Sequence, residues 1–139
     1  MEPRFTSDPA ELDTAFIHRF ITGSYWARGR SMADMERCIA HSLNFGMFLG
    51  PEPIGYARMV TDHTVFGYLM DVFIDPGHRG RGHGARLLQH VLSHPDVARL
   101  HTVRLATRDA QGLYARFGFL PSTEATGLME LKRPGAYGH

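Results

Sequence analysis

The stretch VFGYLMDVFIDPGHRGRGHGARLLQHVLSH, residues 65–94, places a glycine-rich loop between an apolar run and a run with helical periodicity. The first run is rich in aromatic and β-branched residues, which favours a strand. The second run is stopped by Pro95, and HTVRLAT, residues 101–107, has the composition of a further strand. Strand, loop, helix and strand together predict a right-handed βαβ unit with parallel strands. The residues expected to face inward on its helix are Ala85, Leu88, Val91 and Leu92.

Two helices are predicted before the first long strand. Residues 7–21 favour one helix, with Asp8 as its cap and Pro9 in its first turn. Residues 31–43 favour a second helix that begins at Ser31. The two would form a helical hairpin ahead of the strands. The apolar stripes expected to be buried are Leu12, Phe16 and Phe20 on the first helix and Met35, Ile39 and Leu43 on the second.

The remaining segments complete a mixed sheet. Three short aromatic and β-branched runs, separated by turn residues, predict an antiparallel meander before the glycine loop. Further on, Asp109 and Gly118 bound a short helix, and residues 118–133 suggest one or two last strands. We therefore expect an α/β fold of the α+β type, with a single domain over residues 1–139. The meander strands are expected at residues 44–50, 54–62 and 65–75.

Composition excludes several classes of protein. The chain has 139 residues, of which 43% are hydrophobic, enough for one compact domain. A net charge of +1 is too small to indicate a nucleic-acid-binding protein. Cys38 is the only cysteine, which excludes an internal disulfide and a cysteine zinc cluster, and the histidines have no repeated metal spacing, so no metal is predicted. Without a targeting or membrane-spanning pattern, the expectation is a soluble cytoplasmic protein.

The glycine-rich loop predicts an anion site. Backbone N–H groups at a helix N-terminus are unpaired and lie at the positive end of the helix dipole. Gly80, Gly82 and Gly84 remove side chains that would block an anion, and Arg79 and Arg81 add charge. A P-loop is excluded because no Lys and Ser/Thr pair follows the last glycine. A dinucleotide-binding site is disfavoured because the sequence has no acidic residue at the expected distance after the loop, at the end of a second parallel strand. A tight turn with solvated arginines is the simpler alternative.

Read as Arg79-x-x-Gly82-x-Gly84, with DVFIDP before it and LATRDAQGLYARFGF after it, the region resembles the acyl-CoA-binding core of the GNAT superfamily of N-acetyltransferases. The resemblance implies the GNAT fold and transfer of an acetyl group from acetyl-CoA to a primary amine. An acyl-CoA-binding regulatory module without turnover is the alternative. A nucleic-acid-binding domain is disfavoured by the near-neutral charge.

The resemblance implies a cofactor site along one strand and the glycine loop. The main chain of Val72, Phe73 and Ile74 would pair with the pantetheine arm, and an N–H there would stabilise the oxyanion. Thr107 stands where many family members carry Asn and is a weaker cofactor contact. His78 and His83 flank the loop as surface residues or minor phosphate contacts. The pyrophosphate would be held by the loop residues Arg79, Gly80, Arg81, Gly82, His83, Gly84 and Ala85.

Two residues are candidates for proton transfer. Tyr114 matches the tyrosine of the family signature A-x-x-x-Y-x-x-x-G-F, which begins here at Ala110, and would be the general acid at the leaving thiolate. Asp71 carries the only carboxyl group of the apolar run YLMDVFI and is the candidate base or substrate anchor. A satisfied structural carboxylate, with water taking the amine proton, is the open alternative.

The acceptor is expected at the loop GSYWARGR, residues 23–30, which we call the aromatic loop. In GNAT-like folds the acceptor usually enters between the helical hairpin and the central strands. Tyr25, Trp26 and Arg28 combine aromatic surface with a cation, which suits a small substrate with a ring or a carboxylate. Aromatic residues that merely cap the core are the alternative. The expected partner is a small-molecule or peptide amine, with no nucleic acid or membrane partner, and terminal strands could pair in a homodimer.

Overall fold

The computed structural model describes residues 1–133, and the internal packing of the chain divides it into two compact units. The first unit ends at Ala106 and contains the whole sheet and helices α1 to α4. The second unit begins at Thr107 and contains α5 and the short 3-10 helix η3.

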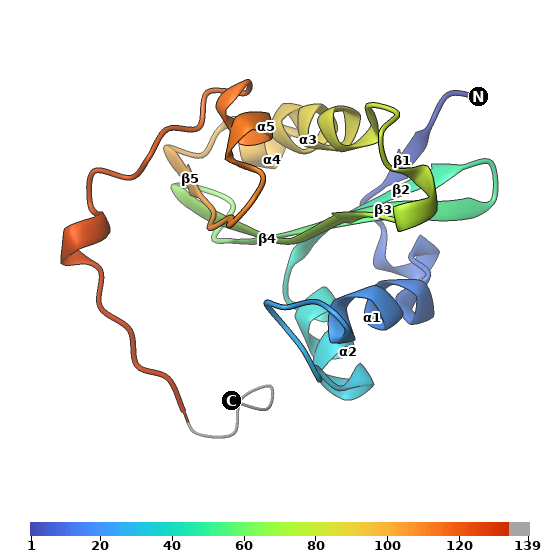
Figure 1. Cartoon of the computed structure of the whole chain (residues 1–139), viewed down its shortest axis with the longest axis horizontal. Helices are drawn as coiled ribbons and strands as arrows, with labels where there is room; N and C mark the ends of the chain where they lie inside the picture. Colours follow the sequence, from blue (N-terminus) through green and yellow to red (C-terminus); the bar gives the residue numbers. More distant parts are fainter. Residues whose placement is uncertain (134–139) are drawn as a thin grey trace. The chain divides into compact units, whose positions relative to one another are not determined.

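The first unit is built on one five-stranded mixed sheet in the order β1-β2-β3-β4-β5 (Figure 1). Neighbouring strands are antiparallel as far as β4, and β4 pairs with β5 in parallel across the connection that contains α3. The predicted antiparallel meander and the parallel βαβ unit are therefore confirmed. The strands are β1 (Arg4–Thr6), β2 (Leu43–Leu49), β3 (Glu52–Thr61), β4 (Phe66–Ile74) and β5 (Thr102–Arg104).

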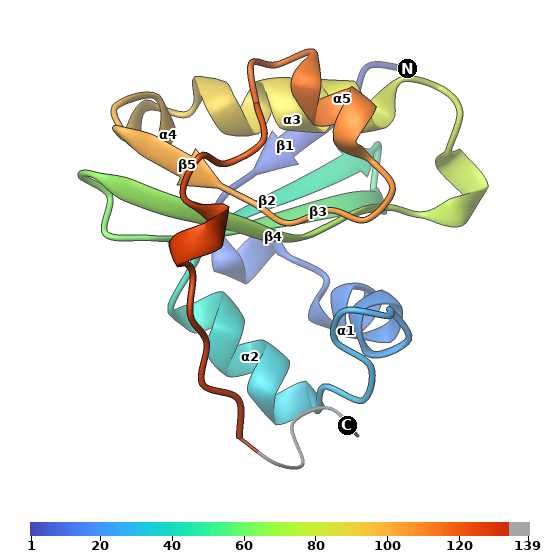
Figure 2. The ribbon, with the colours of Figure 1, turned by 60° about the vertical axis from the view of Figure 1, so that its left-hand side comes forward.

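Helices cover both faces of this sheet. Figure 2 shows α1 and α2 on one face and α3 and α4 on the other. The helical elements of the first unit are η1 (Pro9–Glu11), α1 (Thr14–Thr22), α2 (Met32–Ala40), η2 (Pro76–His78), α3 (His83–Ser93) and α4 (Pro95–Ala98).

The first predicted helix is broken in two, so the prediction of one helix over residues 7–21 is wrong. Asp8 caps only the 3-10 turn η1, and Leu12 has an extended backbone. Asp13 then caps α1 by accepting a backbone N–H of its first turn at 3.0 Å. Because Leu12 is extended, its side chain reaches Gly46 on β2, where an added Cβ would lie 2.7 Å from Leu12 Cδ2. Packing on the sheet therefore overrides the local helical pattern.

The second predicted helix begins where expected and ends earlier. The Ser31 hydroxyl caps α2 by accepting the backbone N–H of Asp34 at 3.0 Å. Met35 and Ile39 are buried as predicted, but Leu43 lies in β2 and not on the helix. Each buried side chain of this size contributes about 1.5–3 kcal/mol to stability. The core between α1, α2 and the sheet consists of Phe16, Ile17, Ile21, Ala27, Met35, Ile39, Tyr56 and Phe73, with Leu12 and Phe20 partly buried beside it.

On the opposite face, the buried side of α3 is rotated slightly from the predicted one. Leu88 and Val91 are buried as expected. Ala85 and Leu92, also expected to face inward, are only half-buried. The remaining buried positions of this helix are His83 and Leu87.

The end of the chain differs most from the sequence-based expectation. The strand predicted over residues 101–107 is formed only at the three residues of β5. In the second unit, α5 (Gln111–Ala115) has Ala110 and not Asp109 at its N-cap, and η3 spans Ala125–Gly127. The part of residues 118–133 that was expected to form strands has no strand in the described chain. Its large apolar side chains are exposed, at Leu120, Leu128, Met129 and Leu131.

Candidate functional site

The loop before α3 has the backbone geometry of an anion site. The φ angle is +78° at Gly80 and +82° at Gly82, and Gly82 is the N-cap of α3. These are left-handed conformations, which glycine adopts without steric cost. A Cβ added at either glycine would meet no heavy atom within 4 Å, so there is open space beside the backbone at both positions. The unpaired N–H groups at the start of α3, with the helix dipole, favour an anion there.

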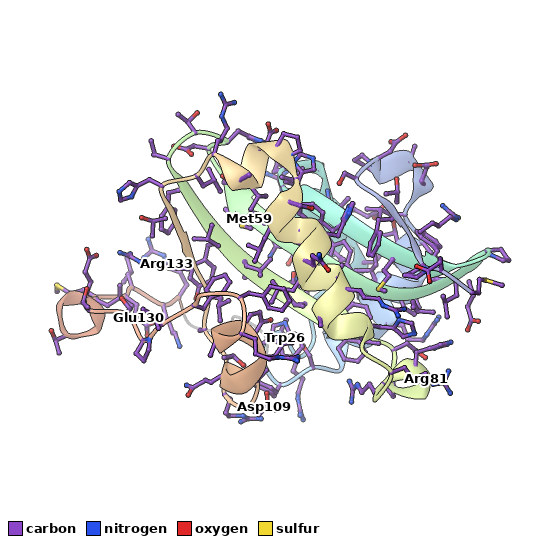
Figure 3. The ribbon with its side chains drawn as sticks, turned by 90° about the horizontal axis from the view of Figure 1, so that it is seen from above. Trp26, Met59, Arg81, Asp109, Glu130 and Arg133 are labelled. Atoms are coloured by element: carbon purple, nitrogen blue, oxygen red, sulfur yellow. The ribbon has the colours of Figure 1, made fainter. Side chains whose placement is uncertain are left out.

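Arginine side chains lie beside this loop. Arg79 and Arg81 are exposed, and Figure 3 shows Arg81 on the loop that precedes α3 in the chain. The Arg79 Nε donates to the carbonyl of Ile74 at 3.2 Å, and its guanidinium carbon lies 5.9 Å from the ring centre of Phe20. Because Ile74 is the last residue of β4, positive charge is held where the strand ends and the loop begins.

His83, the first residue of α3, is buried, so its predicted place on the surface is wrong. Within the described residues its Nδ1 atom is buried without a hydrogen-bond partner. Burial lowers the pKa of this imidazole, and the charges of Arg86, His78 and Arg81 lower the pKa further. An imidazole of lowered pKa, with one unsatisfied buried nitrogen, therefore lies at the start of α3 beside the glycine loop.

A β-bulge interrupts β4 shortly before the loop. Tyr56 on β3 pairs with Phe73, and Arg58 pairs with Met70, so two residues of β4 lie opposite one residue of β3. Asp71 is the first of these two and has a φ of +55°. Asp is one of the few non-glycine residues that adopt this region readily, and a left-handed first residue is a known bulge geometry. The bulge takes main-chain groups of β4 out of the regular ladder.

The Asp71 carboxylate is fully buried and accepts three donors. Its Oδ2 accepts Arg30 Nη1 at 2.6 Å and Arg58 Nε at 2.8 Å, and its Oδ1 accepts the indole Nε1 of Trp26 at 3.0 Å. Burial alone would raise the pKa of Asp71, but the guanidinium groups of Arg58 and Arg30 outweigh burial and hold the pKa below its usual value. A carboxylate of low pKa with both oxygens engaged is poorly suited to take a proton from an amine. This arrangement favours the structural alternative over the base.

A second polar group lies on the same face of the sheet. Arg58 Nη1 donates to the Ser42 hydroxyl at 3.0 Å, and the Tyr56 hydroxyl donates to Asn44 Oδ1. Asn44 Nδ2 in turn donates to the carbonyl of Ile39, the penultimate residue of α2, at 2.9 Å. Burial raises the pKa of Tyr56 well above its usual range. Tyr56 is therefore a structural hydroxyl and a poor proton donor.

Aromatic side chains extend from β4 to the aromatic loop. The rings of Phe20 and Phe73 are stacked with centroids 4.0 Å apart, and Phe20 and Trp26 lie 6.2 Å apart. Tyr25 meets Trp26 edge to face at 5.1 Å. Tyr25 is 41% exposed and Trp26 37% exposed, and Arg28 is exposed as well. Tyr25 and Trp26 thus form an accessible aromatic surface that a hydrogen bond from Trp26 joins to the bulge of β4.

Tyr114 lies in the second unit and is buried there on α5. Its ring meets Phe119 edge to face, with centroids 5.7 Å apart. Thr107, predicted as a cofactor contact, accepts the backbone N–H of Ala110 with its hydroxyl at 3.0 Å and so supports the start of α5. The signature around Tyr114 therefore forms a compact helical turn.

Comparison with known proteins agrees with this geometry. The family model of the GNAT acetyltransferases matches residues 11–119, which include the bulge, the glycine loop and Tyr114. The chain belongs to the GNAT acetyltransferase family. A Xanthomonas campestris protein described as a GNAT-family acetyltransferase is 41% identical, with a TM-score of 0.93 over 100% of this chain and 99% of that one. The expected family, mixed α/β fold and acyltransferase class are therefore confirmed.

Two more distant proteins are also similar to this GNAT acetyltransferase. A Gibberella zeae protein named as an acetyltransferase is 29% identical over 133 residues, which cover 80% of this chain and 75% of that protein. A predicted acetyltransferase from Clostridium acetobutylicum, solved with acetyl-CoA, has a TM-score of 0.68 at 15% identity, and the match covers 94% of this chain and 95% of that one. The second likeness shows a shared fold.

Two functional-site residues of this GNAT acetyltransferase were missed from the sequence. Arg58 is the one charged residue of the apolar run IGYARMV, and Asp71 is the one acid of the adjacent strand, so their pairing had a detectable signal. Arg30 had none, because its contact with Asp71 joins a loop to a strand 41 residues away. Among residues 1–133 there is no group of three or more side chains placed to hold a metal ion. None of the helices in that range combines the length and apolar character needed to cross a membrane.

Proposed function

We propose that this GNAT acetyltransferase transfers the acetyl group of acetyl-CoA to a primary amine by direct attack. The observation that carries the proposal is the left-handed glycine loop at the N-terminus of α3, with open space at Gly80 and Gly82. This loop suits a pyrophosphate because the loop combines unpaired N–H groups, the positive end of a helix dipole and the charge of arginine side chains. The orphaned Nδ1 of His83 at the same helix start also suits a loop that binds a polar ligand.

The main chain of Val72, Phe73 and Ile74 is proposed to bind the pantetheine arm as an added strand. The bulge at Asp71 supports this role because it disturbs the regular pairing of β4 with β3 just before Val72. An N–H in this stretch would stabilise the oxyanion that forms as the amine attacks the thioester. The group supplied by the cofactor is an activated acetyl thioester. Gly84, Ala85 and Thr107 are proposed as the remaining cofactor contacts.

Two proton movements complete the proposed reaction. The carbon–nitrogen bond forms, the carbon–sulfur bond breaks, and the Tyr114 hydroxyl gives its proton to the leaving thiolate. The signature around Tyr114 supports this assignment. The amine proton passes to water, because the ion pairs of Asp71 with Arg30 and Arg58 keep its pKa low.

The acceptor is proposed to bind at the aromatic loop, on Tyr25, Trp26 and Arg28. Their accessible rings and cation suit a small-molecule or peptide amine with a ring or a carboxylate. We also propose that residues 1–139 act as one domain, since the family model spans both compact units. A cytoplasmic location is consistent with Cys38 as a free thiol.

A homodimer is proposed from the end of the chain. Leu128, Met129 and Leu131 are 67%, 93% and 76% exposed, an arrangement that a second copy of the chain would cover. The structure has no strand in this segment, residues 118–133, so the proposed contact would be made by apolar side chains and not by paired strands.

The test is release of free CoA thiol from acetyl-CoA across panels of aliphatic, aromatic, amino-acid and peptide amines. The proposal expects thiol release that depends on at least one class of amine. Acetyl-CoA binding without amine-dependent release would instead support the regulatory module that binds acyl-CoA without turnover.

A further inference from the structure

One hydrogen bond joins the aromatic loop to strand β4 of the sheet. The indole Nε1 of Trp26 donates to Oδ1 of Asp71 at 3.0 Å, across 45 residues of sequence. The Asp71 side chain has no exposed surface, whereas Trp26 is 37% exposed. The indole therefore turns one edge to a buried carboxylate and leaves part of its surface accessible from outside.

The other carboxylate oxygen connects the same loop a second time. Arg30, the last residue of the aromatic loop, donates to Oδ2 of Asp71 at 2.6 Å, and its Nη1 lies 3.8 Å from the sulfur of Met35 on α2. The carbonyl of Arg30 is 2.8 Å from the Nε2 atom of His18 on α1. The aromatic loop therefore contacts both α1 and α2, and two of its residues donate hydrogen bonds to the Asp71 carboxylate. Charge-assisted bonds of this kind have more defined geometry than neutral ones.

Asp71 occupies the position in β4 where the backbone leaves the regular ladder. Its φ of +55° is tolerated by Asp, Asn and Gly, and hydrogen bonds from three donors hold its side chain at this backbone position. The next residue is Val72, whose main chain we have placed beside the thioester. A shift of the Asp71 carboxylate would therefore move both the bulge and the indole.

We propose that Asp71 is a positioning residue that ties the β4 bulge to the aromatic loop, and that Trp26 is the acceptor-specificity residue that it holds. This inference rests on the proposed acetyl transfer for its kinetic consequences only. We call the hydrogen bonds of Asp71 with Trp26 and Arg30 the tie. The tie is a property of the fold, and it holds the aromatic loop at a fixed position relative to the bulge.

Trp26 is the only tryptophan of the chain, so its fluorescence reports the tie without any assay of activity. Asp71→Asn keeps the size and the left-handed tolerance of the side chain but leaves one accepting oxygen in place of two. That oxygen cannot serve both the guanidinium groups and the indole. We expect the emission of Asp71→Asn to shift to longer wavelength and acrylamide to quench it more strongly than in the wild type.

Trp26→Phe tests the same tie from the other side and leaves the ion pairs of Asp71 in place. The variant loses one bond to a charged acceptor and keeps an aromatic ring. We expect the KM for the best amine of the panel to rise about tenfold, with the Kd of CoA within about twofold of the wild type. Met32→Leu on α2 is the control, because Met32 is also 37% exposed but its substitution removes no polar group.

The outcomes separate this inference from the proposed function. Wild-type emission and quenching in folded Asp71→Asn, or a wild-type amine KM in Trp26→Phe, would overturn the tie. If Asp71→Asn does not fold, the KM of Trp26→Phe decides. If the wild type releases no thiol with any amine, the proposed function has failed, and fluorescence alone decides the tie. In that case, wild-type emission in a folded Asp71→Asn variant would overturn the tie. Acrylamide quenching of wild-type Trp26 as strong as that of free tryptophan would also overturn it.

Discussion

The most direct structural prediction concerns a methyl group at Gly82. Gly82→Ala forces alanine into a φ of +82°, which costs about 1–2 kcal/mol of folding stability. Its Cβ would project into space that is free of other heavy atoms within 4 Å, where we place the pyrophosphate. Loss of one charge-assisted bond from the backbone costs about 1.5–3 kcal/mol, or roughly tenfold to a hundredfold in Kd.

The assay is calorimetric titration of the folded variant with CoA and, separately, with pantetheine, which lacks the pyrophosphate. We expect Gly82→Ala to weaken CoA and to leave pantetheine unchanged. Gly50→Ala is the matched control, because Gly50 has a φ of +57° in the turn between β2 and β3. It should lose similar stability and keep the wild-type Kd. Equal CoA affinity in Gly82→Ala and the wild type would refute the placement of the pyrophosphate.

Three further predictions follow from the same structure. The ion pairs hold the pKa of Asp71 below its usual 3.8. The ionised carboxylate therefore stabilises the fold fully above pH 3.8, and this stabilisation is lost as the pH falls through the lowered pKa. In urea unfolding, the wild type should lose stability below pH 3.8 more steeply than Asp71→Asn. Tyr114→Phe should lower kcat by about 10²–10⁴-fold with the Kd of acetyl-CoA unchanged, and full turnover would exclude it as the acid. The double variant Leu128→Glu/Met129→Glu should be a monomer in light scattering, where the wild type should be a dimer. Val65→Glu is the control and should remain a dimer, because Val65 is 54% exposed but lies outside residues 118–133. A monomeric wild type would contradict the proposed dimer.

The elements that the sequence predicted well depend on local signals. The glycine loop and α3 are defined by residues close together in the chain, and so are the Ser31 cap and the strands of the meander. A cap, a left-handed glycine and an apolar period each act within a few residues. The family resemblance came from the same stretch and its spacing to Tyr114, which explains why the family and the fold class were confirmed.

The features that were missed depend on contacts distant in sequence. The bulge at Asp71 is a property of the pairing between β3 and β4, and no residue pattern within β4 reveals it. Burial of the carboxylate with Arg30 and Arg58 requires the loop and two strands to meet. The break between η1 and α1 likewise depends on Leu12 packing against β2. Strands in residues 118–133 were predicted from composition alone, without a partner to pair with.

The central claim is the transfer of an acetyl group to an amine, and isotopic labelling of that group follows the transfer itself. Acetyl-CoA with a ¹³C-labelled acetyl group would be incubated with the protein and the best amine of the panel, and the products measured by mass spectrometry. We predict the label on the amine nitrogen, in amounts equal to the CoA thiol released. Thiol release with the label only in acetate, or labelled acetyl-CoA bound and unchanged, would contradict the account.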